Sequence, residues 1–273
     1  MIKKSLNIDQ FRQTILEHYH QEKREFPWRE TNDPYAILTS EIMLQQTQTD
    51  RVVPKYLAWL DSFPNIHALA QAETTEVLER WVGLGYNRRA IFLHRAAKIM
   101  DSEYNGFVPQ ELTDLLSLPG IGPYTARAIR TFAWGYPEVF IETNIRSVFL
   151  FFFFPDQTAI DDSNIMPLIE SSLYLEDPRT WYYALMDYGS VLKRKTINPN
   201  RNSKHYSKQS RFTGSNREAR GAIVRTLSTG ARYTITDLAT QCGLDRERIT
   251  KALLGLTKEG IVCDMDGVYG IYE

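Results

Sequence analysis

Two glutamates lie where the surrounding sequence controls their protonation. Glu41 belongs to a predicted helix over residues 34–48, whose many aliphatic side chains indicate that much of its surface is buried. Burial against apolar neighbours favours the protonated form of a carboxyl, and a protonated carboxyl can act as a general acid at neutral pH. An ion pair between Glu41 and an arginine, with a purely structural role, is the alternative.

The second glutamate, Glu142, follows the apolar run 139–141 and precedes a helix that we expect to begin at Thr143 or Asn144. A helix N-terminus favours an ionised carboxylate, although helix capping alone would also explain an acid at this position. One protonated and one ionised carboxyl are what the cleavage of a glycosidic bond needs. The acid assists the leaving group, and the anion stabilises or captures the positively charged sugar.

A turn with two glycines predicts a phosphate contact. Its residues are Leu118, Pro119, Gly120, Ile121 and Gly122, and a helix is expected to start near Pro123. Such a turn points main-chain N–H groups and the N-terminus of the next helix in one direction, which suits a phosphate. We interpret residues 115–133 as a helix-hairpin-helix element that holds DNA without reading its sequence. Simple punctuation between two helices is the alternative.

Three glutamines, Gln45, Gln46 and Gln48, follow Glu41 along the chain. Their neutral amide groups both donate and accept hydrogen bonds, so they can replace the Watson–Crick bonds that open when a base leaves the duplex. A polar helix end exposed to solvent is the other interpretation. Together with the two glutamates and the hairpin, the glutamines favour chemistry on an extruded base.

Composition limits the class of protein. The 273 residues carry 32 Lys and Arg against 33 Asp and Glu, a formal net charge of -1, which argues against a protein that coats a polyanion over its whole surface. Cys242 and Cys263 are too few for a disulfide framework or a thiolate metal site, and we expect no metal. No leader or membrane span is recognisable, so we expect a cytoplasmic protein without membrane contacts. We also expect a monomer that associates with the nucleoid.

The elements that must position these residues are nearly all helices, because proline and glycine separate a series of helical patterns. The patterns cover about 8–24, 34–48, 50–62, 74–82, 88–103, 111–117, 123–134, 143–153, 163–174 and 178–193. The chain length predicts two or three modest units. For the aromatic run 149–154 we expect packing in a core or against the C-terminal module, residues 214–273, rather than stacking on bases.

Beyond residue 192 the composition changes twice. Residues 193–220 hold nine Lys or Arg against one acid, Glu218, which indicates a basic connector or a solvated linker. Three helical patterns and a hairpin with an Asp266-Gly267 turn follow from residue 216, which is typical of a winged helix. Its third helix carries cations where a recognition helix would face the major groove, at Arg246, Arg248 and Lys251. Docking of a protein is the alternative role of such a module.

Five motifs, taken in chain order, resemble the MutY family of adenine DNA glycosylases. They are Phe26-Pro27-Trp28-Arg29, Ser40 to Gln48, Trp81-x-Gly83-Leu84-Gly85-Tyr86, Leu118 to Ala126 and Met186-Asp187-x-Gly189. The match spans roughly residues 26–189, and its Gln-Gln-Thr-Gln run is similar to MutY and differs from endonuclease III and the thymine mismatch glycosylases. The resemblance implies an all-α fold, a two-subdomain helix-hairpin-helix glycosylase, followed in this chain by a winged-helix domain.

The resemblance also implies roles, position by position. Glu41 matches the catalytic acid, which protonates the adenine ring and later activates water, while Glu142 matches the catalytic Asp and Asn144 its support. Tyr124 stands where bifunctional relatives carry a Schiff-base lysine, so we expect base excision without strand cleavage. The extruded-base pocket would be lined by Arg24, Phe26, Trp28, Arg29, Leu44 and Asp187. Expected DNA contacts are Gln45, Gln46 as a wedge in the base stack, Gln48, Tyr86, Leu118, Gly120, Ile121, Gly122, Lys193, Arg194 and Lys195.

Three departures from the family pattern change what the resemblance implies. Glu142 is one methylene longer than the catalytic Asp, so its carboxylate can reach about 1.5 Å further or bend aside. The four cysteines of the family's iron-sulfur cluster would fall near Lys193, Asn200, Ser203 and Gln209, which do not suit the cluster, so we expect no cofactor and a connector that supplies phosphate contacts instead. A winged helix stands where the family has a Nudix-like domain that senses 8-oxoguanine opposite adenine.

The combined expectation is a monofunctional glycosylase that hydrolyses the N-glycosidic bond of a flipped purine, adenine in a mispair, during base excision repair of double-stranded DNA. Hypoxanthine, mismatched thymine and alkylated or crosslinked purines stay open as substrates. A catalytically silent DNA-binding or regulatory protein is the alternative from another class. The expected domains are a glycosylase domain 1–192 (barrel with hairpin 28–134, second subdomain 1–27 and 135–192), the connector 193–213 and the winged helix 214–273.

Overall fold

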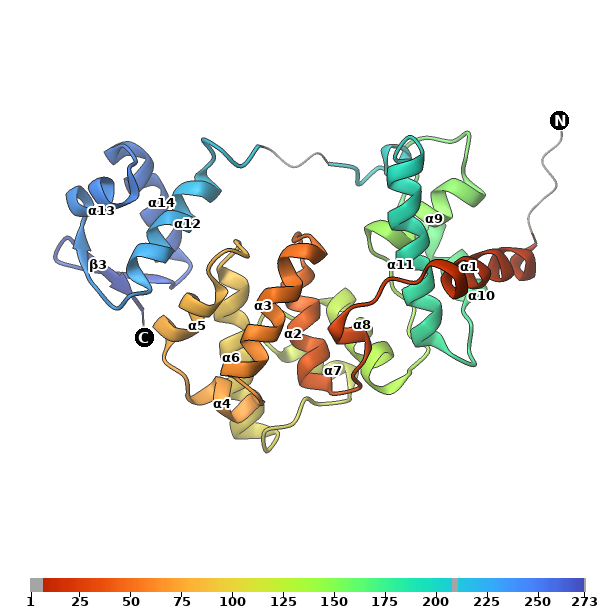
Figure 1. Ribbon diagram of the computed structural model, residues 1–273, viewed down its shortest axis with the longest axis horizontal. Coiled ribbons are helices and arrows are strands. Elements are labelled where there is room, and N and C mark those ends of the chain that lie inside the picture. The colour runs from red at the N-terminus through yellow and green to blue at the C-terminus, as the bar shows by residue number, and fades with distance from the viewer. Residues whose placement is uncertain (1–6, 208–210, 273) are drawn as a thin grey trace. The chain divides into compact units, whose positions relative to one another are not determined.

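The computed structural model describes residues 7–207 and 211–272, which Figure 1 colours along the chain. These residues form two compact units, each built from two stretches of sequence. The first unit contains residues 7–37 and 121–207, and the second contains residues 38–120 and 211–272. In these two ranges we find no helix with the length and hydropathy that a membrane crossing requires.

The first unit is built from helices. They are α1 (Ile8–Glu22), the 3-10 helix η1 (Pro27–Arg29), the start of α2 (Pro34–Leu44), α8 (Pro123–Trp134), α9 (Thr143–Phe153), α10 (Asp162–Ser172), α11 (Pro178–Lys195) and the 3-10 helix η2 (Pro199–Asn202). Polar side chains start several of them by accepting a main-chain N–H, as Asn7, Asp161 and Asp177 do for α1, α10 and α11. These caps explain why the chain turns helical at those residues.

Aromatic rings fill the core of the first unit. Phe11 of α1 meets Phe149 of α9 edge-on at 5.3 Å between ring centroids and Trp181 of α11 at 5.8 Å. Phe149 and Leu150 are fully buried, which confirms the expected core packing for the start of the aromatic run, whereas Phe151 is 39% exposed. This packing fixes α9 and α11 against each other, and both helices carry residues of the candidate site.

The second unit combines helices with one small sheet. Its elements are the rest of α2, α3 (Thr49–Ser62), α4 (Ile66–Gln71), α5 (Thr74–Trp81), α6 (Arg88–Glu103), α7 (Leu112–Ser117), α12 (Asn216–Leu227), β1 (Tyr233–Thr234), α13 (Ile235–Cys242), α14 (Arg246–Lys258), β2 (Val262–Met265) and β3 (Val268–Ile271). Trp59 and Trp81 are buried and meet edge-on at 5.4 Å, joining α3 to α5. The helix α4 has no counterpart among the helices expected from the sequence.

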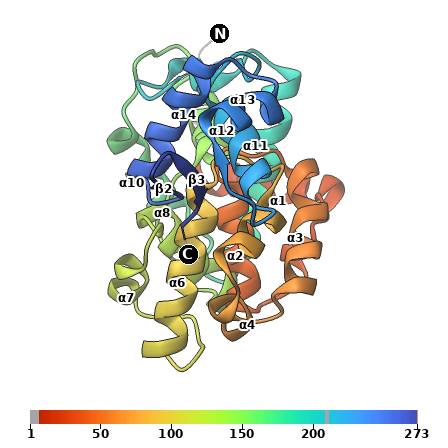
Figure 2. The same ribbon diagram turned by 90° about the vertical axis from the view of Figure 1, so that its left-hand side faces the viewer.

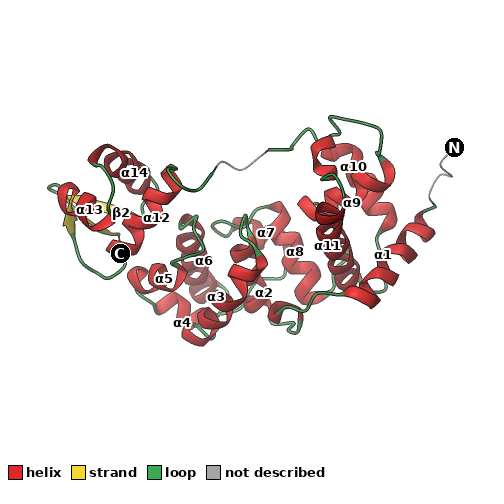
Figure 3. Ribbon diagram, turned by 45° about the horizontal axis from the view of Figure 1, so that its top comes forward, coloured by secondary structure: helices red, strands yellow, loops and turns green. Residues whose placement is uncertain are grey.

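The C-terminal part of the second unit has the element order of a winged helix. Three helices, α12, α13 and α14, pack together beside β2 and β3 (Figure 2), and the strands pair antiparallel in the order β1-β3-β2. Figure 3 shows the small sheet in yellow beside α13. Asp266 and Gly267 join β2 to β3 with φ angles of 54° and 83°, the left-handed conformation that the Asp-Gly turn signal predicted.

The sequence predicted the mostly helical fold correctly, and the structure shows that several helices end at other residues than expected. The helix expected over 34–48 stops at Leu44, because the chain turns at Gln46, whose φ is 56°. The helix expected over 8–24 stops at Glu22, which leaves residues 23–26 extended toward η1. The expected domain limits stay a prediction.

Candidate active site

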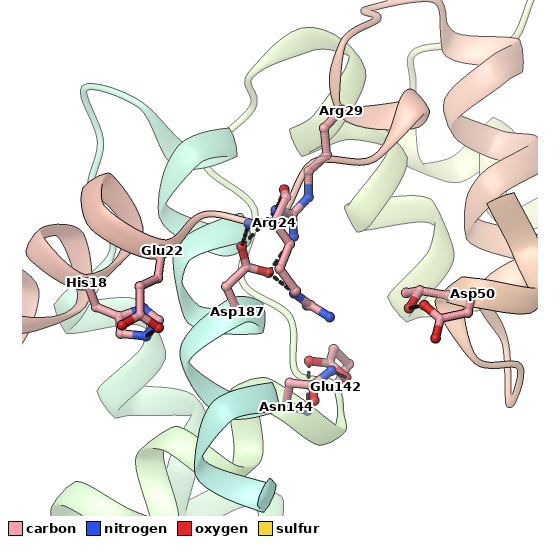
Figure 4. A network of polar contacts seen from close by, with 9 residues as sticks. His18, Glu22, Arg24, Arg29, Asp50, Glu142, Asn144 and Asp187 are labelled. Atoms are coloured by element: carbon pink, nitrogen blue, oxygen red, sulfur yellow. Dashed lines mark hydrogen bonds and ion pairs between the residues drawn. The ribbon is translucent and has the colours of Figure 1, made fainter. Parts of the chain in front are cut away.

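A buried carboxylate organises one half of the candidate site. Asp187 of α11 is 1% exposed and accepts four hydrogen bonds, all from Arg24 and Arg29 (Figure 4). The Arg24 main chain and Nε donate at 2.9 and 2.7 Å, and the two terminal nitrogens of Arg29 donate at 2.9 and 2.8 Å. Both oxygens of Asp187 are therefore engaged, and the carboxylate ties the segment before η1 to α11.

The two arginines decide the charge of Asp187. Burial by itself would raise the pKa of this carboxyl, but the hydrogen bonds and charges of Arg29 and Arg24 outweigh burial and hold the pKa below its usual range. An ionised Asp187 thus accepts three hydrogen bonds from the two guanidinium groups and one from the Arg24 main chain. Its geometry suits the positioning of its neighbours better than proton transfer.

Aromatic residues of the same segment stack beside this ion network. Phe26 and Trp28 lie nearly parallel, with ring centroids 4.9 Å apart and an interplanar angle of 10°. The guanidinium carbons of Arg24 and Arg29 each lie 5.1 Å from the Phe26 ring centroid. Five residues expected in the extruded-base pocket are thus gathered in the first unit. The sixth, Leu44, is the last residue of α2 and belongs to the second unit.

Glu142 is held by three N–H donors at the start of α9. Its Oε1 accepts from the main chains of Asn144 and Ile145 at 2.7 and 2.9 Å, and its Oε2 accepts from Asn144 Nδ2 at 3.2 Å. The side chain therefore caps the helix while the Asn144 amide fixes its second oxygen, as Figure 4 shows. The expected support of Glu142 by Asn144 is present as a direct contact.

Two residues of α11 lie close to the start of α9. A Cβ atom at Gly189 would collide with the main-chain carbonyl of Asn144, so the close approach of the helices requires glycine there. Lys193, in the last turn of α11, is half-buried, and its burial lowers its pKa while the charge of Glu142 opposes that shift. Arg194 and Lys195 are exposed. Lys193 is thus near Glu142 in space, which its place in the basic run did not indicate.

Glu41 lies within the most buried stretch of α2. It is 6% exposed, and its neighbours Ser40 and Ile42 are 1% and 3% exposed. The expectation that Glu41 is buried is therefore confirmed. Its role as an acid stays a prediction.

The glutamine-bearing turn after α2 is held by Arg89, which sequence reasoning missed. The Arg89 guanidinium is buried and donates to the carbonyl oxygens of Ile42, Met43 and Gln45 at 2.7, 2.9 and 2.7 Å. It also donates to Thr47 Oγ1 at 3.1 Å and to the carbonyls of Leu84 and Gly85. Burial lowers its pKa to about 10. The missed signal is its helical spacing with the buried residues Leu93, Ala96, Ala97 and Met100.

Two residues beside Arg89 adopt left-handed backbone conformations. Gln46 has φ 56° and Tyr86 has φ 49°, which few residues other than glycine adopt. The loop that carries Tyr86 is fixed by the Trp81 indole, which donates to the Gly85 carbonyl at 3.1 Å. Arg89 therefore connects the two loops that carry four of the residues expected to contact DNA, which are Gln45, Gln46, Gln48 and Tyr86. Strained positions held by a buried network are common at binding sites.

The glycine turn after α7 has the geometry that its sequence predicted. Gly120 has φ 78°, and a Cβ atom there would lie 2.7 Å from Phe92 Cβ, so only glycine fits. The side chains of Leu118 and Ile121 are buried and anchor the turn, which leaves main-chain groups for any phosphate contact. Gly122 precedes α8, whose first residue is Pro123, as expected. Tyr124 follows in the first turn of α8 and meets Phe140 edge-on at 5.6 Å.

The segment after α11 makes ordinary polar contacts at the positions where the cluster cysteines would fall. Asn200 is 4% exposed and donates from Nδ2 to the Thr143 carbonyl at 3.1 Å and to Ser147 Oγ. Residue 203 pairs with Ile160 in an isolated parallel bridge. Gln209 lies outside the described residues. Amide, hydroxyl and ammonium groups do not fit an iron-sulfur cluster, which is held by thiolates.

Most of these candidate residues lie in a region that matches a known protein family. Residues 39–178 match the HhH-GPD superfamily of base excision DNA repair proteins. The chain belongs to this superfamily. The HhH-GPD region holds Glu41, the glycine turn and Glu142, whereas Arg24, Asp187 and the C-terminal module lie outside it.

Several curated relatives are adenine DNA glycosylases. The protein from Mycolicibacterium smegmatis is 44% identical over 135 residues, which are 49% of this chain and 46% of the relative. The one from Buchnera aphidicola subsp. Baizongia pistaciae is 36% identical over 68% of this chain and 54% of its own length, and the human one is 37% identical over 52% and 28%. The chain spans about half the length of the first two, and less of the human protein.

Two solved structures are similar to this chain in fold. A thermostable thymine-DNA glycosylase aligns with a TM-score of 0.63 and 27% identity, over 69% of this chain and 89% of that one. A non-covalent endonuclease III-DNA complex aligns with a TM-score of 0.56 over 67% and 86%, and at 18% identity it supports the fold alone.

Proposed function

We propose that the protein is a DNA glycosylase that excises adenine from a mispair in double-stranded DNA. The carrying observation is the contrast between two carboxyls. Glu41 is buried at 6% exposure within α2, whereas Glu142 is partly exposed and fixed by three N–H donors. Opposite environments of this kind separate a general acid from a permanent anion. The adenine DNA glycosylases similar to this chain make adenine the first candidate base.

The proposed reaction breaks one bond and forms one. Glu41 gives its proton to the adenine ring, and the C1′–N bond breaks with its electron pair leaving on the base. The Glu142 carboxylate stabilises the oxocarbenium-like sugar. Water then adds to C1′ as the Glu41 carboxylate takes its proton, which restores the acid. Tyr124 offers no amine for a Schiff base, so the strand stays intact.

The other residues would bind and orient the DNA. The Asp187 network would hold the stacked Phe26 and Trp28 as a wall of the base pocket. Gln46 would enter the base stack, with Gln45, Gln48 and Tyr86 beside it. The hairpin and the end of α11 would contact phosphates. We further propose a nucleoid-associated monomer in the cytoplasm that works without an iron-sulfur cluster.

The test is single-turnover base release from duplexes with adenine opposite guanine, cytosine or 8-oxoguanine. We expect release by the wild type and a loss of about 100-fold or more in Glu41→Gln, because proton transfer typically contributes this much. Glu142→Gln keeps the size of the side chain and removes its charge, so its rate should also fall. Glu25→Gln, an exposed glutamate near the pocket segment, is the matched control. Equal release by the wild type and Glu41→Gln rejects the assignment.

A second candidate substrate is mismatched thymine, favoured by the alignment with a thymine-DNA glycosylase. The panel therefore includes thymine opposite guanine, hypoxanthine, and alkylated and crosslinked purines. Release from only one of these duplexes identifies the base. DNA binding without abasic sites on any duplex identifies instead a silent DNA-binding or regulatory protein.

A further inference from the structure

A cavity of about 640 Å³ lies within the second unit, where the C-terminal module meets the loops that carry Gln46 and Tyr86. One wall consists of residues 46–48 and 82–87, and the other consists of Phe212 and one face of α12. Its volume is in the range of pockets that hold a small ligand or one unit of a polymer. Of the arginines in its lining, only Arg217 belongs to the basic run 193–220 for which the sequence predicts phosphate contacts.

The cavity is positively charged. Arg51, Arg217 and Arg225 line it, and no Asp or Glu is among the described residues of its lining. In the described part of the chain, neither Arg51 nor Arg225 forms an ion pair, and both are exposed. Arg217 donates to the Tyr86 hydroxyl at 3.0 Å. Three guanidinium groups around one cavity attract an anion, and guanidinium groups match the geometry of phosphate oxygens.

The rest of the lining suits a nucleic acid rather than a small anion. Gln46 and Gln48 bring side-chain amides, and Tyr86 and Phe212 bring rings, of which Phe212 is 59% exposed. Rings and amides beside arginines can contact the sugar and bases next to a phosphate. The left-handed backbone at Gln46 and Tyr86 directs these two residues at one cavity.

The expected recognition helix offers less than its sequence suggested. Arg248 of α14 donates to Glu218 at 2.7 Å, so an ion pair inside the module engages this cation. Arg246 and Lys251 remain exposed on α14. The chain therefore has two possible DNA-binding faces, one formed by the cations of α12 and one by those of α14, and variants of each can be compared directly.

We propose that the cavity binds the phosphate backbone of duplex DNA, through Arg51, Arg217 and Arg225. The C-terminal module then contacts DNA with α12 and not with α14. This inference rests on the proposed function, since it takes DNA as the substrate. It extends the binding surface from the glycosylase loops onto a module outside the HhH-GPD region.

The test measures binding of the full chain to an undamaged, fully paired duplex at several salt concentrations. We expect Arg217→Ala/Arg225→Ala to weaken binding about 10-fold or more and to reduce the slope of log K against log salt by about 1.8, or about 0.9 for each phosphate that the variant no longer neutralises. Arg246→Ala/Lys251→Ala removes the same charge from α14 and should keep the wild-type Kd. Arg225→Glu alone is a second variant that should keep its fold, because Arg225 is exposed and makes no ion pair among the described residues. It should also bind the duplex more weakly than the wild type.

Two outcomes would overturn the inference. One is wild-type DNA affinity in the cavity variants, which would leave the cavity to a protein partner. The other is an equal loss in the α14 variant, which would indicate a general charge effect. Because no base needs to be released from this duplex, a failure of adenine excision leaves the binding result intact, and the two proposals fail separately.

Discussion

In the first unit a buried anion, Asp187, lies between two guanidinium groups, whereas in the second unit a buried cation, Arg89, donates to carbonyl and hydroxyl oxygens. No carboxylate pairs with Arg89 among the residues that the structure describes. The first arrangement depends on full charges and therefore on protonation. The second depends on the positions of main-chain dipoles in two loops, so it fixes loop shape and responds little to acid.

Neutralising Asp187 should have the largest effect on stability and tests whether the first arrangement depends on charge. Asp187→Asn keeps the size of the side chain but leaves two guanidinium groups without their anion. We expect the free energy of unfolding to fall by about 4 kcal/mol, the range for breaking a buried ion pair. Chemical denaturation at pH 7 measures the loss. Asp162→Asn, which disrupts a more exposed pair with Arg146, is the control and should cost clearly less.

Replacing Arg89 tests the second arrangement. Arg89→Met removes the donors and leaves buried carbonyl oxygens unpaired, so we expect unfolding to become easier by about 2 kcal/mol. The glutamine-bearing turn should also lose its shape, which predicts weaker DNA binding. Urea denaturation and a binding titration check the two effects. Arg88→Ala, whose exposed guanidinium lies 4.6 Å from the Phe92 ring, should change stability by less than about 1 kcal/mol. Equal effects of both variants would refute the assigned role.

Acid should weaken the two units in different pH windows. His94 of α6 is 3% exposed, and burial lowers its pKa to about 4, reinforced by the charges of Lys98 and Arg95 and opposed by the main chains of Ala72 and Ala70. The unfolded chain therefore binds more protons than the folded chain between about pH 6.5 and pH 4. Stability contributed by neutral His94 is complete above this window and is lost as the pH falls through it.

This titration gives the smallest expected effect of the three. Between pH 7 and pH 5.5, neutral His94 predicts a loss of about 1.2 kcal/mol. Asp187 adds nothing there, because its stabilising charge is lost only as the pH falls below its ordinary range toward its lowered pKa. Thermal unfolding of His94→Gln should show a flatter pH profile than that of the wild type. His20→Gln, which removes an exposed histidine without an ion pair among the described residues, is the matched control.

The parts of the site that were predictable from the sequence are local. Glu142 caps the helix that begins at Thr143, and Gly120 shapes a turn with its immediate neighbours, so short spacings contain the information. The burial of Glu41 followed from the apolar residues around it.

The rest depends on contacts that are distant along the chain. Arg24 and Asp187 are separated by 163 residues, and no sequence feature near either residue identifies the other as its partner. Arg89 donates to main-chain oxygens, which every residue carries and which leave no trace in residue types. Arg248 was expected on a DNA-facing helix, but the partner that engages it, Glu218, lies 30 residues earlier. These three sets of contacts depend on tertiary packing, which the local sequence pattern does not reveal.

The contact between Gly189 and the Asn144 carbonyl has a genetic consequence. A missense change from glycine to alanine at this codon removes no functional group, yet the added methyl would push on the peptide that carries Asn144 and, through it, Glu142. For the proposed glycosylase, we expect such an allele to be scored with the Glu142 variants in a mutator screen. Under the proposed function, variants at Gly189 therefore belong in one class with variants at Glu142.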